Sequence, residues 1–282
     1  MSDGQSRAAS GTARSVAYLR AAHMVIDGKP PILDDSVIER LLGADARALI
    51  LSRADHLQAP NMRGLRSHVV LRSRVAEDAL ADDAARGSRQ YVILGAGLDT
   101  FAWRQPAWAA GLSVIEVDHP ASQAEKQAML AGAGLQIPKN LRFAAIDFES
   151  ETLGQGLVRN GVDISKQASF SWLGVTMYLT RDAIDQVLET TAAFPPGSTI
   201  TLTFAQPRAD DEFGAWLAGR AAEAGEPWLS YFTPEEMEQT LRRAGYARID
   251  FLGRDEATRR YYEGRSDGLV APRRVSIVTA TV

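Results

Sequence analysis

The chain has 282 residues, of which 45% are hydrophobic and 23% are charged, and it contains no cysteine. This is the balance of an ordinary globular protein, and the length suffices for one large α/β domain with a helical cover. The absence of cysteine excludes disulfides, thiolate catalysis and cysteine-ligated metal, so we predict no metal site and a cytoplasmic protein. A formal net charge of −4 argues against a nucleic-acid partner. No run approaches the ~20 apolar residues that span a bilayer, so we predict no membrane partner.

The first part of the chain has a helical pattern. From Thr12 to about Arg86 the hydrophobic residues recur at helical spacing, and no convincing strand precedes Gln90. We therefore predict a helical N-terminal lid over residues 1–88 and a ligand-binding core over residues 89–282.

Short apolar runs dominate the remainder of the chain. Five of them are separated by segments of helical length: YVILGAG, LSVIEVD, LRFAAID, ASFSWLGV and STITLTF. Continuous apolar runs are typical of buried parallel strands, which need crossover helices between them. Two more runs, ARIDFLG and RRVSIVTATV, have little helix between them, which favours an antiparallel end to the sheet. The pattern predicts an α/β fold with a seven-stranded, mostly parallel sheet and an antiparallel last strand.

Two helices of the core can be bounded from their caps. Thr233 and Glu236 have the spacing of a capping box, and Gly245 stands where a left-handed residue ends a helix. Thr180 can cap a second helix. Residues 206–230, which separate the fifth predicted strand from the capping box, are predicted to form a lid insertion over the carboxyl edge of the sheet.

A glycine turn and an acidic strand end indicate a nucleoside site. Gly95, Ala96 and Gly97 directly follow the first apolar run, and glycines in such a turn let the backbone approach a ligand closely. Glu116 and Asp118 end the next strand, about 20 residues later, where an acid meets an adenosine ribose. A plain tight turn and a solvated strand end are the alternatives for each feature alone, and their combination favours ligand binding.

The residues around the turn distinguish between two nucleoside ligands. Thr100 stands where a dinucleotide-binding turn would have its third glycine, and Asp99 beside it would repel a pyrophosphate. After the third strand, Asp147 can accept the adenine amino group while Phe148 offers an apolar face. We therefore predict S-adenosyl-L-methionine as the cofactor, with S-adenosyl-L-homocysteine as the product.

Several motifs resemble the bacterial branch of the leucine carboxyl methyltransferase family: YVILGAGLDTFAWR, EVDHPASQAEKQ, AIDFES, SWLGVTMYLT, and the helical SVAYLRAAH and HVVLRSRVAEDAL. The resemblance covers nearly the whole chain and implies a methyltransferase with a Rossmann-like class I fold. It also implies that Arg72 pairs with the methionine carboxylate and that Gly95 lies under the methionine moiety. Asp118 would bind the ribose, and Asp147 with Phe148 the adenine.

Neighbouring positions complete the predicted cofactor site. Arg74 is close enough to Arg72 in sequence to exchange roles with it, and a surface charge on a helix is the alternative for either residue. In some relatives, including the enzymes that act on protein phosphatase, a Glu stands where this chain has Leu173, which argues against a phosphatase-type substrate. The remaining predicted cofactor-binding residues are Ala96, Gly97, Asp99, Glu116, His119 and Leu173 itself.

The acceptor is expected to be a carboxylate or hydroxyl of a small molecule or peptide, methylated by in-line transfer. A carboxylate is already ionised and needs no base, whereas a hydroxyl needs one. The four histidines are more typical of packed or surface positions, so we assign no catalytic residue. The candidate substrate contacts are Tyr178, Arg208, Trp216, Tyr231 and Arg20.

Two other functions remain open from the sequence, which makes no prediction of oligomeric state. One is a module that binds S-adenosylmethionine without catalysis, because methyl transfer needs few dedicated groups. The other is a nicotinamide-dependent oxidoreductase of the short-chain kind, which would need a Tyr-x-x-x-Lys pair. Tyr178 is followed four residues later by Asp182, which argues against that enzyme.

Overall fold

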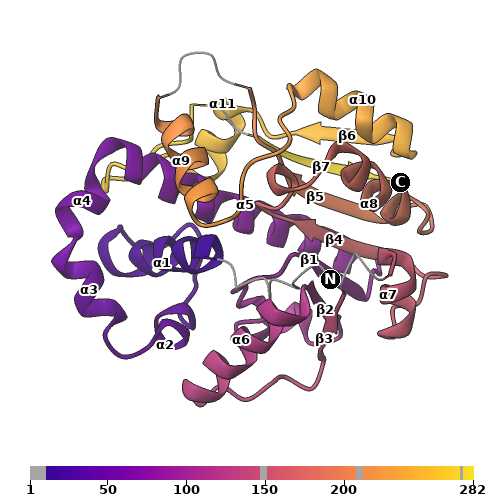
Figure 1. Ribbon diagram of the computed structural model, residues 1–282, viewed down its shortest axis with the longest axis horizontal. Coiled ribbons are helices and arrows are strands. Elements are labelled where there is room, and N and C mark those ends of the chain that lie inside the picture. Colours follow the sequence, from indigo (N-terminus) through magenta and orange to yellow (C-terminus); the bar gives the residue numbers. More distant parts are fainter. Residues whose placement is uncertain (1–10, 147–150, 208–211, 274–275) are drawn as a thin grey trace, which may run out of the picture.

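The computed structural model describes residues 11–146, 151–207, 212–273 and 276–282. Its strands are β1 (Gln90–Leu94), β2 (Ser113–Asp118), β3 (Leu141–Ala145), β4 (Ala168–Trp172), β5 (Thr199–Thr203), β6 (Arg248–Phe251) and β7 (Ile277–Thr281). They form one sheet in the order β3-β2-β1-β4-β5-β7-β6 (Figure 1). The pairs among β1 to β5 are parallel, and β7 is antiparallel to both β5 and β6. The predicted strands, their parallel pairing and the antiparallel last strand are confirmed.

The sheet is covered on both faces, which explains why its central strands are buried throughout. Every residue of β1, β4 and β5 is buried. One face packs against α7 (Leu153–Arg159), α8 (Arg181–Ala192) and α10 (Pro234–Ala244). The other face packs against α5 (Pro60–Ala85), the short helices η1 (Phe101–Trp103) and η2 (Ala107–Ala109), and the α11–η4 segment (Arg254–Ala257 and Thr258–Tyr262).

The N-terminal helices gather beside the sheet, at the left of Figure 1. They are α1 (Gly11–Ile26), α2 (Ile38–Leu42), α3 (Ala46–Ser52) and α4 (Ala54–Gln58), and α1 and α2 share a hydrophobic cluster with α6 (Pro120–Gly132). The long helix α5 belongs to both parts, because its first half packs with these helices and its second half lies on the sheet. The insertion after β5 contains α9 (Glu212–Glu223), beside α1.

The predicted helix ends are confirmed where the cap residues carry the signal. Thr233 and Glu236 form a full capping box, and Gly245 ends α10 with a left-handed φ of 113°. The Thr180 hydroxyl accepts a hydrogen bond from the amide of Ala183 at the start of α8. Among the described helices, none combines the length and the hydropathy needed to cross a membrane.

Candidate active site

The glycine turn after β1 is tied to the end of β2. The amides of Gly95 and Ala96 both donate to the carbonyl of Val117, at 2.8 and 3.1 Å. Gly95 and Gly97 have left-handed φ values of 65° and 48°, which other residues rarely adopt. A Cβ on Gly95 would lie 2.5 Å from a methyl of Val175, which follows β4. The glycines are therefore required both by the turn and by the close approach of the β4 end.

Asp118, the last residue of β2, points its carboxylate at this turn. One oxygen accepts a hydrogen bond from the amide of Gly97 at 2.6 Å, and the other accepts from the amide of His119 at 2.7 Å. Burial raises the pKa of the Asp118 carboxyl, and the two amides act in the opposite direction. Each oxygen keeps lone pairs beyond these bonds, so that a ligand hydroxyl can also donate to it.

Glu116 lies deeper than Asp118, two residues before the end of the strand. It is fully buried and forms an ion pair with Lys126 of α6 at 2.5 Å. Its second oxygen has no hydrogen-bond partner among the described residues, and burial raises the pKa of the carboxyl to about 7. The structure therefore joins Glu116 to a helix packed on the sheet, and leaves Asp118 as the carboxylate at the strand end.

Arg72 brings a cation to the same edge from α5. Its guanidinium lies against Gly174, because a Cβ added to that glycine would meet an Arg72 Nη at 2.5 Å. In the part of the chain that the structure describes, we find no hydrogen-bond or ion-pair partner for it. Burial lowers the pKa of Arg72 to about 10, and repulsion from Arg20 adds to this. Arg72 is thus a partly buried cation without a counter-charge.

Arg74 does not share this position. It is exposed, forms an ion pair with Asp78 at 2.7 Å and donates to the carbonyl of Ile32 at 3.2 Å. Of the two candidate arginines, only Arg72 lies beside the end of β4.

The start of α1 lies directly against the glycine turn. A Cβ on Gly97 would lie 3.3 Å from the Cβ of Ala13 at the start of α1. In the same turn of α1, the amide of Thr12 donates to the carboxylate of Glu226 of the insertion at 3.4 Å. The first turn of α1 therefore lies between the glycine turn and the insertion.

Tyr178 is a predicted substrate residue that lies near enough to Arg72 for the two groups to affect each other's pKa. It ends the short helix η3 (Thr176–Tyr178) after Gly174. Burial raises the pKa of its hydroxyl, whereas side-chain hydrogen bonds with Thr12 and Trp228 and the charge of Arg72 lower it. The insertion runs alongside η3, because the amide of Leu229 donates to the carbonyl of Met177 at 2.6 Å. Tyr231 follows in this segment.

Arg20 has a different environment from the one predicted for a substrate contact. It is buried and donates to Asp35 at 2.8 Å and to the hydroxyl of Thr100 at 2.9 Å. Thr100 in turn donates to Asp35 at 2.6 Å and accepts from Arg104 at 3.0 Å. This buried network fastens α1 to the segment after the glycine turn. Thr100, which replaces the third glycine, is its centre.

The other predicted residues lie at several places. Asp99 accepts a hydrogen bond from the amide of Phe101, the first residue of η1, at 2.7 Å, and His119 Nδ1 caps α6 by accepting from the amide of Ala121 at 3.2 Å. Leu173 stands directly before Gly174 at the end of β4. Asp147, Phe148 and Arg208 lie outside the described residues.

Trp216 is farther from the glycine turn. It is 49% exposed and stacks on Phe213, with ring centroids 5.5 Å apart. Both rings line a surface pocket of 330 Å³ that also includes Met62. Met62 precedes Arg72 by ten residues of α5, a rise of about 15 Å.

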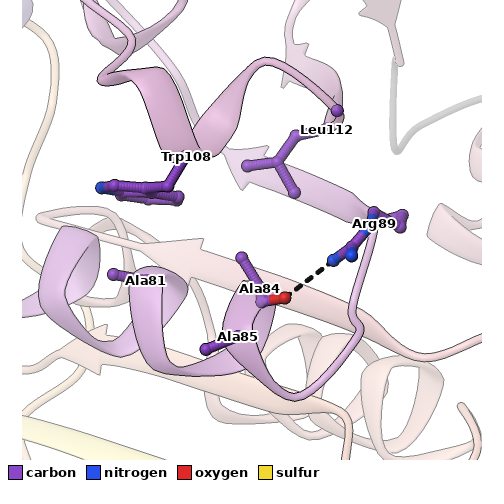
Figure 2. A pocket seen from close by; sticks show the side chains of 7 residues that line it. Ala81, Ala84, Ala85, Arg89, Trp108 and Leu112 are labelled. Atoms are coloured by element: carbon purple, nitrogen blue, oxygen red, sulfur yellow. Dashed lines mark hydrogen bonds between the residues drawn. The ribbon is translucent and has the colours of Figure 1, made fainter.

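A second pocket, of 210 Å³, lies at the opposite edge of the sheet. Figure 2 shows it between the end of α5 and the loop before β2, with Trp108 on one side and Arg89 on the other. Arg89 donates to the carbonyl of Ala84 at 2.7 Å. Because Arg89 precedes β1 and Leu112 precedes β2, this pocket is at the amino ends of the strands, away from the glycine turn.

Sequence reasoning missed two contributors to the site. Val175 closes against Gly95, and the buried indole nitrogen of Trp228 in the insertion lies against the side chain of Tyr178. Both contacts join segments that are far apart in sequence, so no local pattern marks them.

The comparisons with known proteins agree with this architecture. The pattern of the leucine carboxyl methyltransferase family matches residues 13–192. A Bacillus subtilis protein named as an S-adenosyl-L-methionine-dependent methyltransferase, YktD, is 35% identical over 71% of this chain and 67% of its own length. A Mycobacterium avium protein named likewise is 32% identical over 77% of this chain and 72% of its own.

Solved structures share the fold. A Streptomyces avermitilis protein of the DUF574 family aligns with a TM-score of 0.62 at 14% identity, over 97% of each chain. A Thermobifida fusca structure described as a methyltransferase aligns with a TM-score of 0.58 at 20% identity, over 98% of this chain and 96% of its own. The predicted Rossmann-like methyltransferase fold is confirmed, and the nicotinamide alternative is not supported. The chain belongs to the leucine carboxyl methyltransferase family and is a methyltransferase, as its motifs predicted.

Proposed function

We propose that this enzyme transfers the methyl group of S-adenosyl-L-methionine to an oxygen of a small molecule or peptide, with a carboxylate as the preferred acceptor and a hydroxyl as the alternative. When bound, the cofactor supplies an electrophilic methyl group on its sulfonium. The residues at the carboxyl edge of the sheet would bind and orient it, and the lid would exclude water.

The unpaired guanidinium of Arg72 is the observation that carries this proposal. An arginine that is partly buried without a counter-charge is unfavourable unless a ligand supplies one. The methionine carboxylate is a planar anion that a guanidinium binds through two parallel hydrogen bonds. Arg72 would therefore hold the amino-acid end of the cofactor.

The opposite end of the site fits the nucleoside. Asp118 is fixed by the amides of Gly97 and His119 and keeps acceptor capacity for the ribose hydroxyls. The left-handed glycines at 95 and 97 leave the backbone of the turn without side chains, which would allow a close approach of the cofactor. Asp147 and Phe148 stay the proposed adenine contacts.

The contacts of two histidines, His23 and His119, support a carboxylate acceptor, because these contacts hold local structure in place. His23 donates or accepts at both ring nitrogens, to Asp27 at 2.8 Å and from the amide of Ile32 at 3.0 Å. His119 Nδ1 is engaged as a helix cap. A carboxylate acceptor is ionised at neutral pH, so that alignment and exclusion of water can supply most of the acceleration.

Incubation with methyl-labelled S-adenosylmethionine tests the acceptor class. The purified chain would be offered a panel of carboxylic acids, phenols and peptides, and the products analysed by mass. We expect an added methyl group on a carboxylic acid, as a base-labile ester. Transfer only to phenols or alcohols would contradict the preferred acceptor, and transfer to nitrogen would contradict O-methylation.

A further inference from the structure

The segment that follows β4 contacts both ends of the proposed cofactor site. At Gly174, the guanidinium of Arg72 occupies the space that a side chain would fill. A Cβ added there would lie 2.5 and 2.9 Å from the two Nη atoms and 2.9 Å from the Cζ. The next residue, Val175, has a methyl group 2.5 Å from the position of a Cβ on Gly95 in the glycine turn. Two consecutive residues therefore contact the cation and the turn.

Gly174 makes its contact with Arg72 because it has no side chain. Its φ of 75° lies in the left-handed region, which favours glycine. A methyl group at this position would meet the end of the Arg72 side chain, so the guanidinium would have to move. The position of the cation thus depends on the backbone of Gly174.

Thr203, the last residue of β5, holds this backbone in place. The last pair between β4 and β5 is Trp172 with Leu202, so the ladder between these strands ends before Gly174. Beyond the ladder, the amide of Gly174 donates to Oγ1 of Thr203 at 2.7 Å, and the hydroxyl of Thr176 donates to the Thr203 carbonyl at 2.8 Å. Thr203 is itself buried and pairs with β7 on its other side.

We propose that Thr203 is a positioning residue for cofactor binding: through Gly174 it holds the Arg72 guanidinium at the separation from the glycine turn that the methionine carboxylate requires. This inference rests on the proposed function. Two parallel hydrogen bonds to a carboxylate need a defined geometry, so a small shift of the guanidinium weakens the charged contact. The nucleoside end has an anchor of its own, the 2.6 Å bond between the Gly97 amide and Asp118.

Calorimetric titration of the full chain with two ligands tests the proposal. S-adenosylhomocysteine carries the carboxylate, whereas 5′-methylthioadenosine keeps the adenine, ribose and thioether but lacks the amino-acid part. The substitution Thr203→Val keeps the shape of the side chain and removes the hydroxyl that accepts from Gly174. We expect it to weaken S-adenosylhomocysteine binding about tenfold and to change 5′-methylthioadenosine binding less than about twofold.

Gly174→Ala tests the same contact without a change in β5. Its methyl group would displace the Arg72 guanidinium, so S-adenosylhomocysteine binding should weaken by at least about tenfold. Binding of 5′-methylthioadenosine should again change less than about twofold.

Two further variants of β5 separate positioning from a general loss of stability. Thr203→Ser keeps the hydroxyl and should bind both ligands within about twofold of the wild-type chain. Thr201→Val is the matched control, because it makes the same substitution at a buried threonine two residues earlier, whose hydroxyl bonds to that of Thr279 at 3.0 Å. It should leave both affinities unchanged. In an Arg72→Met background, Thr203→Val should change S-adenosylhomocysteine binding less than about twofold, because the cation that it positions is absent.

Unchanged S-adenosylhomocysteine affinity in Thr203→Val would overturn the inference, and so would an equal loss for both ligands in Thr203→Val or Gly174→Ala. An equal loss in Thr203→Ser or full additivity with Arg72→Met would overturn it as well. Those results would leave the proposed function standing. If the wild-type chain bound neither ligand, the proposed function would fail and this inference with it.

Discussion

Two arginines on helix α5, Arg66 and Arg72, have opposite environments. Arg66 is fully buried, donates twice to Asp27 at 2.7 Å and donates to the carbonyl of Leu57 at 2.6 Å. His23 shares Asp27, at 2.8 Å. Arg72 lies six residues later on α5 and has no such partner in the described chain.

The difference separates a structural charge from a binding charge. The Asp27 cluster satisfies every strong donor that enters it, so it fastens α1 to α5 and needs no ligand. Arg72 keeps a guanidinium without a counter-charge, which is unfavourable for the free chain and favours an anionic ligand. The predictions below test whether the two regions behave in these two ways.

The largest effect is expected on stability at the Asp27 cluster. Asp27→Ala leaves Arg66 buried and unpaired, which should lower the free energy of unfolding by about 3–5 kcal/mol. Urea denaturation measures this change. Asp78→Ala, which breaks an exposed pair with Arg74, is the control and should lower it by about 0–1 kcal/mol. Equal losses in the two variants would show that the cluster has no special role.

Glu116 is an intermediate case, since only one of its oxygens is paired. Its pKa is raised from 4.5 to about 7, mainly by burial, so the folded state keeps a proton that the unfolded chain releases. The resulting stability is present below about pH 4.5 and is lost as the pH rises through about 7. Relative to Glu116→Gln, the wild-type free energy of unfolding should fall by up to about 3 kcal/mol across that range. Urea denaturation of both proteins from acid to neutral pH measures this difference, and a constant difference would contradict the raised pKa.

Arg72→Met should separate binding from stability. We expect S-adenosylhomocysteine affinity to fall about 100-fold, because a bidentate charged contact is lost, while 5′-methylthioadenosine affinity changes little. The free energy of unfolding should stay the same or rise, because an unpaired cation is removed. Calorimetry and urea denaturation provide the two readouts. A loss of several kcal/mol of stability would place Arg72 with Arg66 as a structural charge.

The smallest effect is expected at Asp118. Asp118→Asn removes a charged acceptor of the ribose hydroxyls, and should weaken S-adenosylhomocysteine and 5′-methylthioadenosine by a similar factor of about ten. Parallel titrations with the two ligands check this. An effect confined to S-adenosylhomocysteine would mean that Asp118 does not contact the nucleoside.

The fold could be predicted from sequence because its signals are local. Apolar runs marked the strands, and the caps at Thr180, Thr233 and Gly245 marked helix ends within the sequence that forms them. The glycine turn and Asp118 could be located as well, because the carboxyl ends of parallel strands meet at one edge.

The roles of individual charges could not be predicted in this way. Arg20 and Arg72 both lie on N-terminal helices, and only the tertiary contacts of Arg20 with Asp35 and Thr100 set it apart. Glu116 and Asp118 are two residues apart on one strand. Only the ion pair of Glu116 with the buried Lys126 of a later helix distinguishes them. The contact between Trp228 and Tyr178 depends on how the insertion folds back along η3.

Titration of the wild-type chain with S-adenosylhomocysteine tests the central claim most directly. The account predicts saturable binding of one ligand per chain, together with a free energy of unfolding that rises with ligand concentration. No detectable binding up to about 1 mM ligand would contradict the cofactor site at the edge formed by Gly95, Asp118 and Arg72.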